Sequence, residues 1–159
     1  MRPGLDIVLY MSSGANPASL NLRKTFHFDS PVPVYQADAC VVTCFDARFD
    51  QAIRKFLKRR GIELFDQVKI PGSAKALGAP DSESDRDFAM RMLRTSIRLH
   101  HPARFLLIGH NDCGAYPGLP PSAVASDLIQ AGAFLRQAEP SIPVEIYFAD
   151  FDGVYEIDY

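Results

Sequence analysis

The sequence is poor in cysteine, in net charge and in long apolar runs, and each shortage excludes a class of protein. Three cysteines among 159 residues are an odd number, which does not suit the disulfide framework of a small secreted domain. A formal net charge of -2 provides no overall attraction to nucleic acid or to an anionic membrane. The first apolar run, residues 5–11, contains Asp6, is too short to cross a bilayer and lacks the layout of a signal peptide. We therefore expect a cytoplasmic protein with no nucleic-acid partner and no membrane partner.

What the sequence does contain is the composition of a globular domain. Its residues are 47% hydrophobic and 23% charged, and no repeat, low-complexity tract or linker divides the chain. Residues 1–38 show only weak period-two character, interrupted by Pro31 and Pro33. We interpret residues 1–38 as an N-terminal arm that wraps the domain or meets a second subunit. Residues 39–159 are predicted to form one domain.

From residue 39 onward, short apolar runs alternate with helical patterns. The expected strands cover residues 39–44, part of 65–70, 105–109, 144–148 and 155–157, the last after a hairpin turn at Asp152-Gly153. The expected helices lie directly before Gly61, over about 84–100 and over 122–138. This alternation predicts an α/β domain with a mostly parallel central sheet, flanked by helices and closed by a C-terminal hairpin.

Four further details of these elements are predicted. Residues 71–81, rich in Gly and Pro, are predicted to form a loop. Ser84 and Asp87 resemble a capping box that opens the helix over 84–100. The buried stripe of that helix is predicted to be Ala89, Met92, Leu93, Ser96 and Ile97. The inward face of the next helix is predicted to be Val124, Leu128, Ala131 and Leu135.

Two short polar segments follow two of the expected strands: Cys44-Phe45-Asp46-Ala47-Arg48 and His110-Asn111-Asp112-Cys113-Gly114. Ligands of open α/β sheets gather beyond the carboxyl ends of the strands, so we expect Cys44, His110 and Cys113 to converge. Two thiolates and an imidazole suit zinc, whereas magnesium and calcium prefer oxygen ligands. Three protein ligands leave a fourth position, which is typical of a catalytic rather than a structural zinc site.

Asp46 and Arg48 follow Cys44 at a spacing of two residues. If the segment is extended, all three side chains project from one face. Asp46 could then bind zinc directly or accept a hydrogen bond from zinc-bound water, while Arg48 orients its carboxylate. Zinc lowers the pKa of bound water to about 7, so the pattern indicates hydration or hydrolysis chemistry.

Other interpretations of the same residues remain open. Cys44 and Cys113 could instead form a redox pair, or each thiol could be a small buried hydrophobe. Cys40 lies roughly 13 Å along the strand from Cys44, so it is predicted to belong to the core. The remaining histidines are predicted not to be ligands, although one of them could act as a proton shuttle: His27, His100 and His101. The basic residues 58–60 fit a solvated helix end, with a nucleic-acid patch as the alternative.

The two segments resemble the motifs of the β-class carbonic anhydrases, Cys-x-Asp-x-Arg after the first core strand and His-x-x-Cys-Gly after a later one. The resemblance covers about residues 39–116 and implies the fold of that family. It implies Zn²⁺ held by Cys44, His110 and Cys113, with Asp46 and Arg48 as the catalytic dyad. In a closed site Asp46 would be the fourth ligand. The implied reaction is that of a lyase, the reversible hydration of carbon dioxide to bicarbonate by zinc-bound hydroxide, in a homodimer or higher homo-oligomer.

The sequence also departs from the usual pattern of that family. Ala47 replaces the serine usually found between the dyad residues, and residues 69–72 read Lys-Ile-Pro-Gly where Arg-Asn-Ala-Gly is more typical. These departures leave two alternatives open. One is a zinc-binding member of the fold that has lost turnover and has a regulatory role. The other is a hydrolase of another small substrate, such as a carbon–sulfur compound.

Overall fold

The computed structural model describes residues 23–30 and 32–158. The chain divides into two units, Met1–Pro33 and Val34–Tyr159. The apolar run at residues 5–11 and most of the predicted arm lie outside the described residues. The described residues of the first unit form neither helix nor strand. The second unit contains all the elements discussed below.

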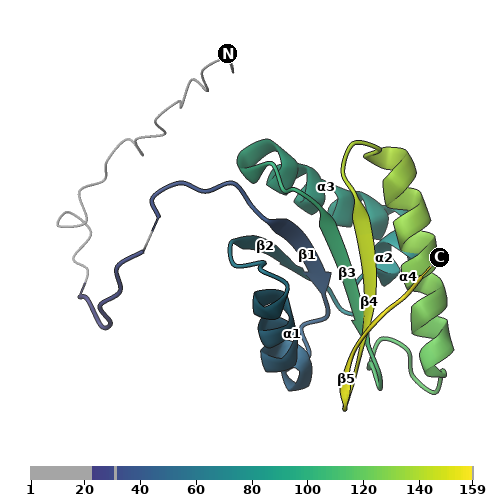
Figure 1. The fold of residues 1–159 in the computed structure, drawn as a ribbon. Coiled ribbons are helices and arrows are strands. Elements are labelled where there is room, and N and C mark those ends of the chain that lie inside the picture. Colours follow the sequence, from purple (N-terminus) through teal and green to yellow (C-terminus); the bar gives the residue numbers. More distant parts are fainter. Residues whose placement is uncertain (1–22, 31, 159) are drawn as a thin grey trace. The chain divides into compact units, whose positions relative to one another are not determined.

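The second unit is built around a five-stranded sheet (Figure 1). Its strands are β1 (Ala39–Thr43), β2 (Phe65–Lys69), β3 (Phe105–His110), β4 (Val144–Asp150) and β5 (Gly153–Glu156). Their order is β2-β1-β3-β4-β5, and every neighbouring pair is parallel except β4 and β5. The predicted α/β fold with a mostly parallel sheet and a closing hairpin is therefore confirmed.

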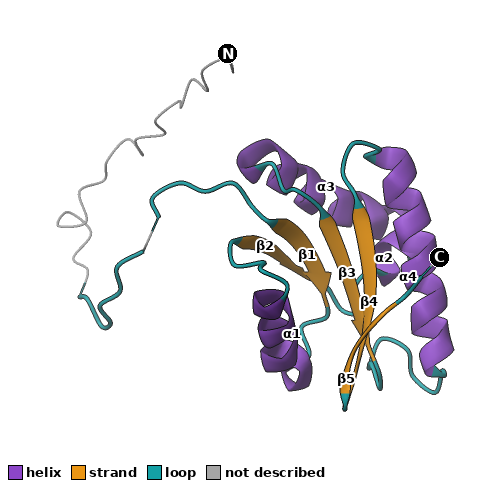
Figure 2. Cartoon of the chain, in the orientation of Figure 1, coloured by secondary structure: helices purple, strands orange, loops and turns teal. Residues whose placement is uncertain are grey.

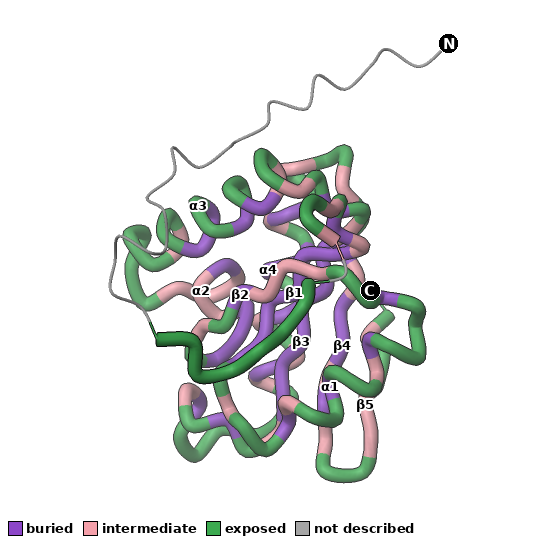
Figure 3. The backbone as a smooth tube through the Cα atoms, turned by 90° about the vertical axis from the view of Figure 1, so that its left-hand side faces the viewer, coloured by how far each residue is buried: buried purple, intermediate pink, exposed green. Residues whose placement is uncertain are grey.

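Helices cover both faces of the sheet (Figure 2). They are α1 (Ala47–Arg59), α2 (Lys75–Gly78), α3 (Glu83–His100) and α4 (Pro121–Ala138). Every residue of β1 and β3 is buried, as expected for central parallel strands covered on both faces (Figure 3). No helix of the described residues is long and apolar enough to cross a bilayer.

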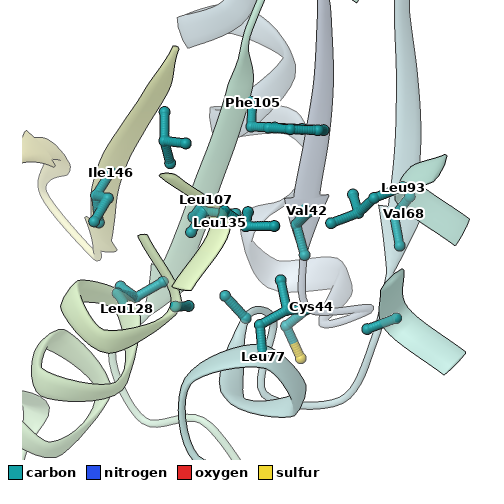
Figure 4. Close-up of a cluster of buried hydrophobic side chains, with 14 of the residues drawn as sticks. Val42, Cys44, Val68, Leu77, Leu93, Phe105, Leu107, Leu128, Leu135 and Ile146 are labelled. Atoms are coloured by element: carbon teal, nitrogen blue, oxygen red, sulfur yellow. The ribbon is translucent and has the colours of Figure 1, made fainter. Parts of the chain in front are cut away.

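The core consists of two clusters, one on each face of the sheet. The residues of α1 pack against alternate side chains of the central strands, including Val41 and Ile108. The other cluster contains residues of α2, α3 and α4 together with Cys40, Val42 and Cys44 (Figure 4). Because side chains of a strand alternate between the faces, Cys44 leaves the sheet on the side of the larger cluster.

The helix boundaries confirm most of the sequence predictions and correct two details of α3. The predicted inward face of α4 is buried at all four positions. In α3, Ser82 rather than Ser84 is the N-cap, and its hydroxyl accepts a hydrogen bond from the Asp85 N–H. The prediction that Met92 is buried was also wrong: Met92 is 42% exposed, and Met90 is buried in its place. Met92 lines a groove beside β2, which is the edge strand of the sheet formed by the described residues.

Residues 71–81 contain a short helix where a loop was predicted. Gly78, its last residue, lies against the backbone of α4. A Cβ atom placed on Gly78 would meet the carbonyl oxygen of Asp127 at 2.1 Å and the Ala131 nitrogen at 2.9 Å. The single-turn helix α2 is therefore held by close backbone contact with α4. A contact of this kind cannot be predicted from the pattern of hydrophobic residues.

Gly78→Ala is expected to destabilise the domain, because the added methyl group must displace the backbone of α4. Overpacking of this kind typically costs about 1–3 kcal/mol in the free energy of unfolding, measured by urea denaturation. Gly153→Ala is the matched control, since its Cβ would meet nothing closer than 3.8 Å. Equal stability of both variants would contradict the close contact between α2 and α4.

Candidate metal centre

The three predicted ligands converge at the carboxyl ends of two neighbouring strands. Cys44 directly follows β1, and His110 ends β3, which pairs with β1 in parallel. Cys113 returns to the same point three residues after His110. The sulfur and imidazole nitrogen atoms of this Cys44–His110–Cys113 cluster lie within 4.8 Å of one another, and all three residues are buried. The two Sγ atoms are 4.0 Å apart.

The ring of His110 is oriented by its second nitrogen. Its Nδ1 donates a hydrogen bond of 2.7 Å to the backbone oxygen of Asn111, and the ring packs on Phe49 with 4.6 Å between the centroids. This bond assigns the proton to Nδ1 and leaves a lone pair on Nε2. Nε2 is buried and lacks a hydrogen-bond partner in the described part of the chain. A buried nitrogen without a partner is costly unless it binds something else.

The two thiols differ in how readily they ionise. Burial opposes ionisation of Cys44, but the His110 side chain in its protonated, cationic form and the backbone N–H groups of Gly72 and Asp46 outweigh burial and lower the pKa of Cys44 to about 7. For Cys113 burial prevails, together with the nearby sulfur of Cys44, and the pKa is raised. Cys44 is therefore the first thiolate to form, and a cation shared by both sulfurs would favour the second.

Asp46 and Arg48 form a hydrogen-bonded pair beside the cluster. The Arg48 Nε and NH2 groups donate to the Asp46 carboxylate at 2.6–3.1 Å, and Oδ2 of Asp46 lies 4.0 Å from His110 Nε2. The hydrogen bonds from Arg48 lower the pKa of Asp46 to about 2. In this structure the carboxylate is therefore ionised and held by the guanidinium.

The segment from Cys44 to Arg48 is not extended throughout, so the one-face arrangement considered from the sequence does not apply to Arg48. Asp46 is the N-cap of α1, and its Oδ1 accepts a hydrogen bond from the Arg48 N–H at 3.0 Å. Helical structure begins at Ala47, because an aspartate at this position satisfies a free N–H group of the first turn. Arg48 therefore reaches Asp46 by folding back from the first helical turn.

Asp112 is a further member of the site that the sequence did not single out. The Arg48 NH1 group donates to its carboxylate, and the NH2 group donates to its backbone oxygen, both at 2.9 Å. Asp112 has a positive φ of 51°, which turns its carbonyl toward the guanidinium. Its place between two candidate ligands was the only available signal.

A cavity of about 540 Å³ lies beside Cys44 and the Asp46–Arg48 pair. It is lined by Cys44, Phe45, Asp46, Arg48, Pro71, Gly72, Asp112, Gly114 and Ala115. The segment after β2, which holds Pro71 and Gly72, supplies one wall. A mostly apolar wall therefore faces the charged groups of Asp46 and Arg48.

The donor set fits zinc. With bond lengths of about 2.3 Å to sulfur and 2.0–2.1 Å to nitrogen, a tetrahedral zinc separates its ligand atoms by about 3.5–3.8 Å. The 4.0 Å between the sulfurs is close to that value. The unpaired Nε2 of His110 supplies the third donor. The Cys44–His110–Cys113 cluster is thus consistent with a zinc site of the β-carbonic anhydrase type.

Within the second unit, Cys40, His100 and His101 lie outside the Cys44–His110–Cys113 cluster, as predicted. Cys40 is fully buried in the core and does not belong to the cluster. His100 donates a hydrogen bond from Nδ1 to Asp66, whose carboxylate also accepts from the hydroxyl groups of Tyr35 and Ser96. His101 adopts a left-handed conformation at the end of α3, and His27, in the first unit, is paired with Asp29.

The Asp66 carboxylate predicts a pH-dependent contribution to stability. Burial opposes its ionisation, but its three hydrogen bonds outweigh burial and lower its pKa. Its stabilising effect is therefore present above the unfolded pKa near 4 and is lost as the pH falls through the folded value. Asp66→Asn is expected to cost about 2 kcal/mol at pH 7 and progressively less as the pH falls below the unfolded pKa near 4, measured by urea unfolding. Asp152→Asn, at an exposed carboxylate, is the control, and a loss independent of pH would contradict this role.

Comparisons with known proteins place the fold. The chain is similar to a carbonic anhydrase from Streptococcus mutans, with 18% identity over 91% of this chain and 93% of that chain and a TM-score of 0.56. It is similar to a β-carbonic anhydrase, isoform I, from Trichomonas vaginalis, with 14% identity, 82% and 87% coverage and a TM-score of 0.57. One of two tetrameric β-carbonic anhydrases from Sordaria macrospora has 10% identity, 79% and 82% coverage and a TM-score of 0.51. No curated protein matches the chain at the level of sequence.

At these identities the similarity to solved structures establishes the fold alone. Together with the Cys44–His110–Cys113 cluster, it defines an α/β protein of the β-carbonic anhydrase type. The family described as "Putative carbonic anhydrase" matches residues 35–157. The chain belongs to that family.

Proposed function

We propose that this protein is a zinc-dependent carbonic anhydrase, a lyase that catalyses the reversible hydration of carbon dioxide to bicarbonate. The observation that carries the proposal is the convergence of two thiols and an unpaired imidazole nitrogen beside an arginine-bound carboxylate. Cys44, His110 and Cys113 would hold the zinc. When bound, zinc would supply the Lewis acidity that makes a water molecule nucleophilic near neutral pH.

Asp46 would act as the hydrogen-bond acceptor that orients the attacking water. Its carboxylate faces the cavity, and a pKa of about 2 keeps it ionised throughout the neutral range. Arg48 donates to both oxygens of Asp46, which supports an arrangement in which Asp46 would not be a zinc ligand and the fourth position would be free for substrate. Arg48 would also attract the bicarbonate anion as it forms.

The walls of the cavity suit a small, weakly polar substrate. Phe45, Pro71 and Ala115 offer carbon atoms and few hydrogen-bonding groups. Carbon dioxide needs no hydrogen bonds to enter such a space, whereas bicarbonate would be held by the guanidinium and the metal. The apolar wall of the cavity would therefore accommodate carbon dioxide, and the polar groups would bind bicarbonate.

We also propose a homo-oligomer and a cytoplasmic location. The Sordaria macrospora proteins of the same fold are described as tetrameric, which supports self-association of this chain. The three cysteines are free thiols, and two of them are the candidate zinc ligands. Free thiolate ligands of this kind persist in a reducing compartment.

The direct test is stopped-flow hydration of carbon dioxide by the zinc-loaded protein. Catalysis is expected, and it should vanish when zinc is removed by a chelator and return when zinc is added. Zinc binding without hydration would contradict the proposed activity and favour a regulatory member of the fold. A panel of small carbon–sulfur substrates would then separate that outcome from a hydrolase with a different substrate.

A further inference from the structure

The turn between β4 and β5 lies beside Arg48, although neither motif contains it. A two-residue turn, Phe151-Asp152, joins the strands, since Asp150 pairs with Gly153. The ring of Phe151 lies 5.8 Å from the guanidinium carbon of Arg48 and 5.4 Å from the ring of Phe49. Phe49 itself lies 5.7 Å from the same guanidinium carbon. The rings of Phe49 and Phe151 therefore both lie within cation–π distance of the Arg48 guanidinium, which binds Asp46.

A second connection joins this turn to the segment between the candidate ligands. Oδ1 of Asp150 accepts hydrogen bonds from the Asn111 side chain at 2.9 Å and from the Phe151 N–H at 2.8 Å. The side-chain oxygen of Asn111 accepts in turn from the Asp112 N–H at 2.8 Å. Asp112 then binds the far side of Arg48 through its carboxylate and its backbone oxygen.

The two connections converge on one group. The ring of Phe151 contacts the guanidinium directly, and Asp150 reaches it through Asn111 and Asp112. Phe151 is 65% exposed, so burial of the ring does not account for its position. An exposed aromatic residue at a hairpin tip, fixed by its own backbone N–H to Asp150, presents a surface to the cation instead.

We propose that Asp150 and Phe151 are positioning residues that hold the Arg48 guanidinium in the geometry in which it binds Asp46. The β4–β5 turn is thereby a third component of the site, beside the two motifs. The inference rests on the proposed function only for its effect on turnover. The effect on Arg48 itself is independent of metal and substrate.

The first test measures Arg48 directly by NMR in both the metal-free and the zinc-loaded protein. The Nε–H signal of Arg48, assigned by its loss in Arg48→Lys, is expected to exchange slowly with water because it is bonded to Asp46. Phe151→Ala should speed that exchange about threefold, given the strength of exposed cation–π contacts. Asp150→Ala should also speed it, because Asn111 and Asp112 lose the hydrogen bond that fixes them beside Arg48. Phe151→Tyr keeps an aromatic face and should restore the parent rate.

The control for Phe151→Ala is Phe88→Ala, because Phe88 is another exposed ring beside an arginine, Arg91, at 5.7 Å. Phe88→Ala should leave the Arg48 signal unchanged. If Phe151→Ala and Asp150→Ala also leave it unchanged, the positioning role is overturned, whether or not the protein hydrates carbon dioxide.

The second test asks whether the effect on turnover passes through Arg48. Phe151→Ala is expected to lower kcat/KM for hydration about threefold in the parent and not at all in an Arg48→Gln background, a coupling that a double-mutant cycle measures. Equal losses in both backgrounds would overturn the proposal. A parent without hydration activity would contradict the proposed function, while the NMR result would still decide the role of the turn.

Discussion

Cys113→Ser is expected to abolish stoichiometric zinc binding. Serine offers a hydroxyl group that does not ionise near neutral pH, so one of three protein ligands is lost. Loss of outer-shell partners alone typically weakens metal binding 10- to 100-fold, so loss of a direct ligand should exceed about 100-fold. Competition with a chelating dye measures the dissociation constant, and elemental analysis measures the zinc content.

Cys40→Ala is the matched control for that variant. Cys40 is as deeply buried as the candidate ligands but lies in the core, outside the metal cluster. It should keep one zinc per chain and lose only about 1 kcal/mol of stability through the small void it leaves. Zinc affinity that falls equally in both variants would indicate loss of folding rather than loss of a ligand. Parent affinity in Cys113→Ser would exclude Cys113 as a ligand.

Asp46→Asn is expected to abolish most hydration activity while the zinc stays bound. The amide cannot accept a proton or a charge-assisted hydrogen bond as the carboxylate does, and Arg48 loses one of its two ionic partners, keeping Asp112. Positioned groups of this kind contribute about 10²- to 10⁴-fold to a rate, so kcat/KM should fall within that range. Stopped-flow assays and zinc analysis of the same sample separate the loss of turnover from loss of metal.

Asp50→Asn is the control for that substitution. Asp50 also lies in the first turn of α1, but its carboxylate pairs with Lys69 and does not line the cavity. Its kcat/KM should stay close to that of the parent. Because the pKa of Asp46 is about 2, its protonation should not contribute to any change in rate between pH 5 and pH 9. A parent-like Asp46→Asn enzyme would remove Asp46 from the mechanism.

The sequence predicted the sheet and the convergence of the metal cluster for the same physical reason. Buried parallel strands are short continuous apolar runs, and β1 and β3 stand out as such. A side chain placed directly after a parallel strand lies at the carboxyl edge of the sheet. Cys44 and His110 could therefore be placed together without any knowledge of intervening loops.

The details that the sequence missed depend on contacts between distant segments. Gly78 allows the backbone of helix α2 to approach that of α4. The Gly- and Pro-rich composition of residues 71–81 predicts a loop instead, because it contains no sign of this contact. Ser82 and Ser84 both precede an aspartate by three residues, so the spacing alone could not select the N-cap. Met92 follows the helical period of its buried neighbours, but it lies beside the edge strand β2, where the sheet does not cover it.

In the site, too, the sequence predicted residues at strand ends but not the contacts made by segments far apart in the chain. Asp112 and Phe151 contact Arg48 from segments that are far from it in the sequence. The predicted turn at Asp152-Gly153 was one residue too late, and the observed turn places Phe151 at the tip of the hairpin. A pattern of residue types identifies candidate ligands at strand ends, but it does not identify the groups that orient them.

X-ray absorption spectroscopy at the zinc edge, on protein purified without added metal, is the most direct test of zinc binding by Cys44, His110 and Cys113. We expect one zinc per chain with two sulfur ligands at about 2.3 Å and one imidazole nitrogen at about 2.0–2.1 Å, the fourth ligand being a light atom. A shell without sulfur, or protein that folds fully and takes up no zinc, would contradict this prediction.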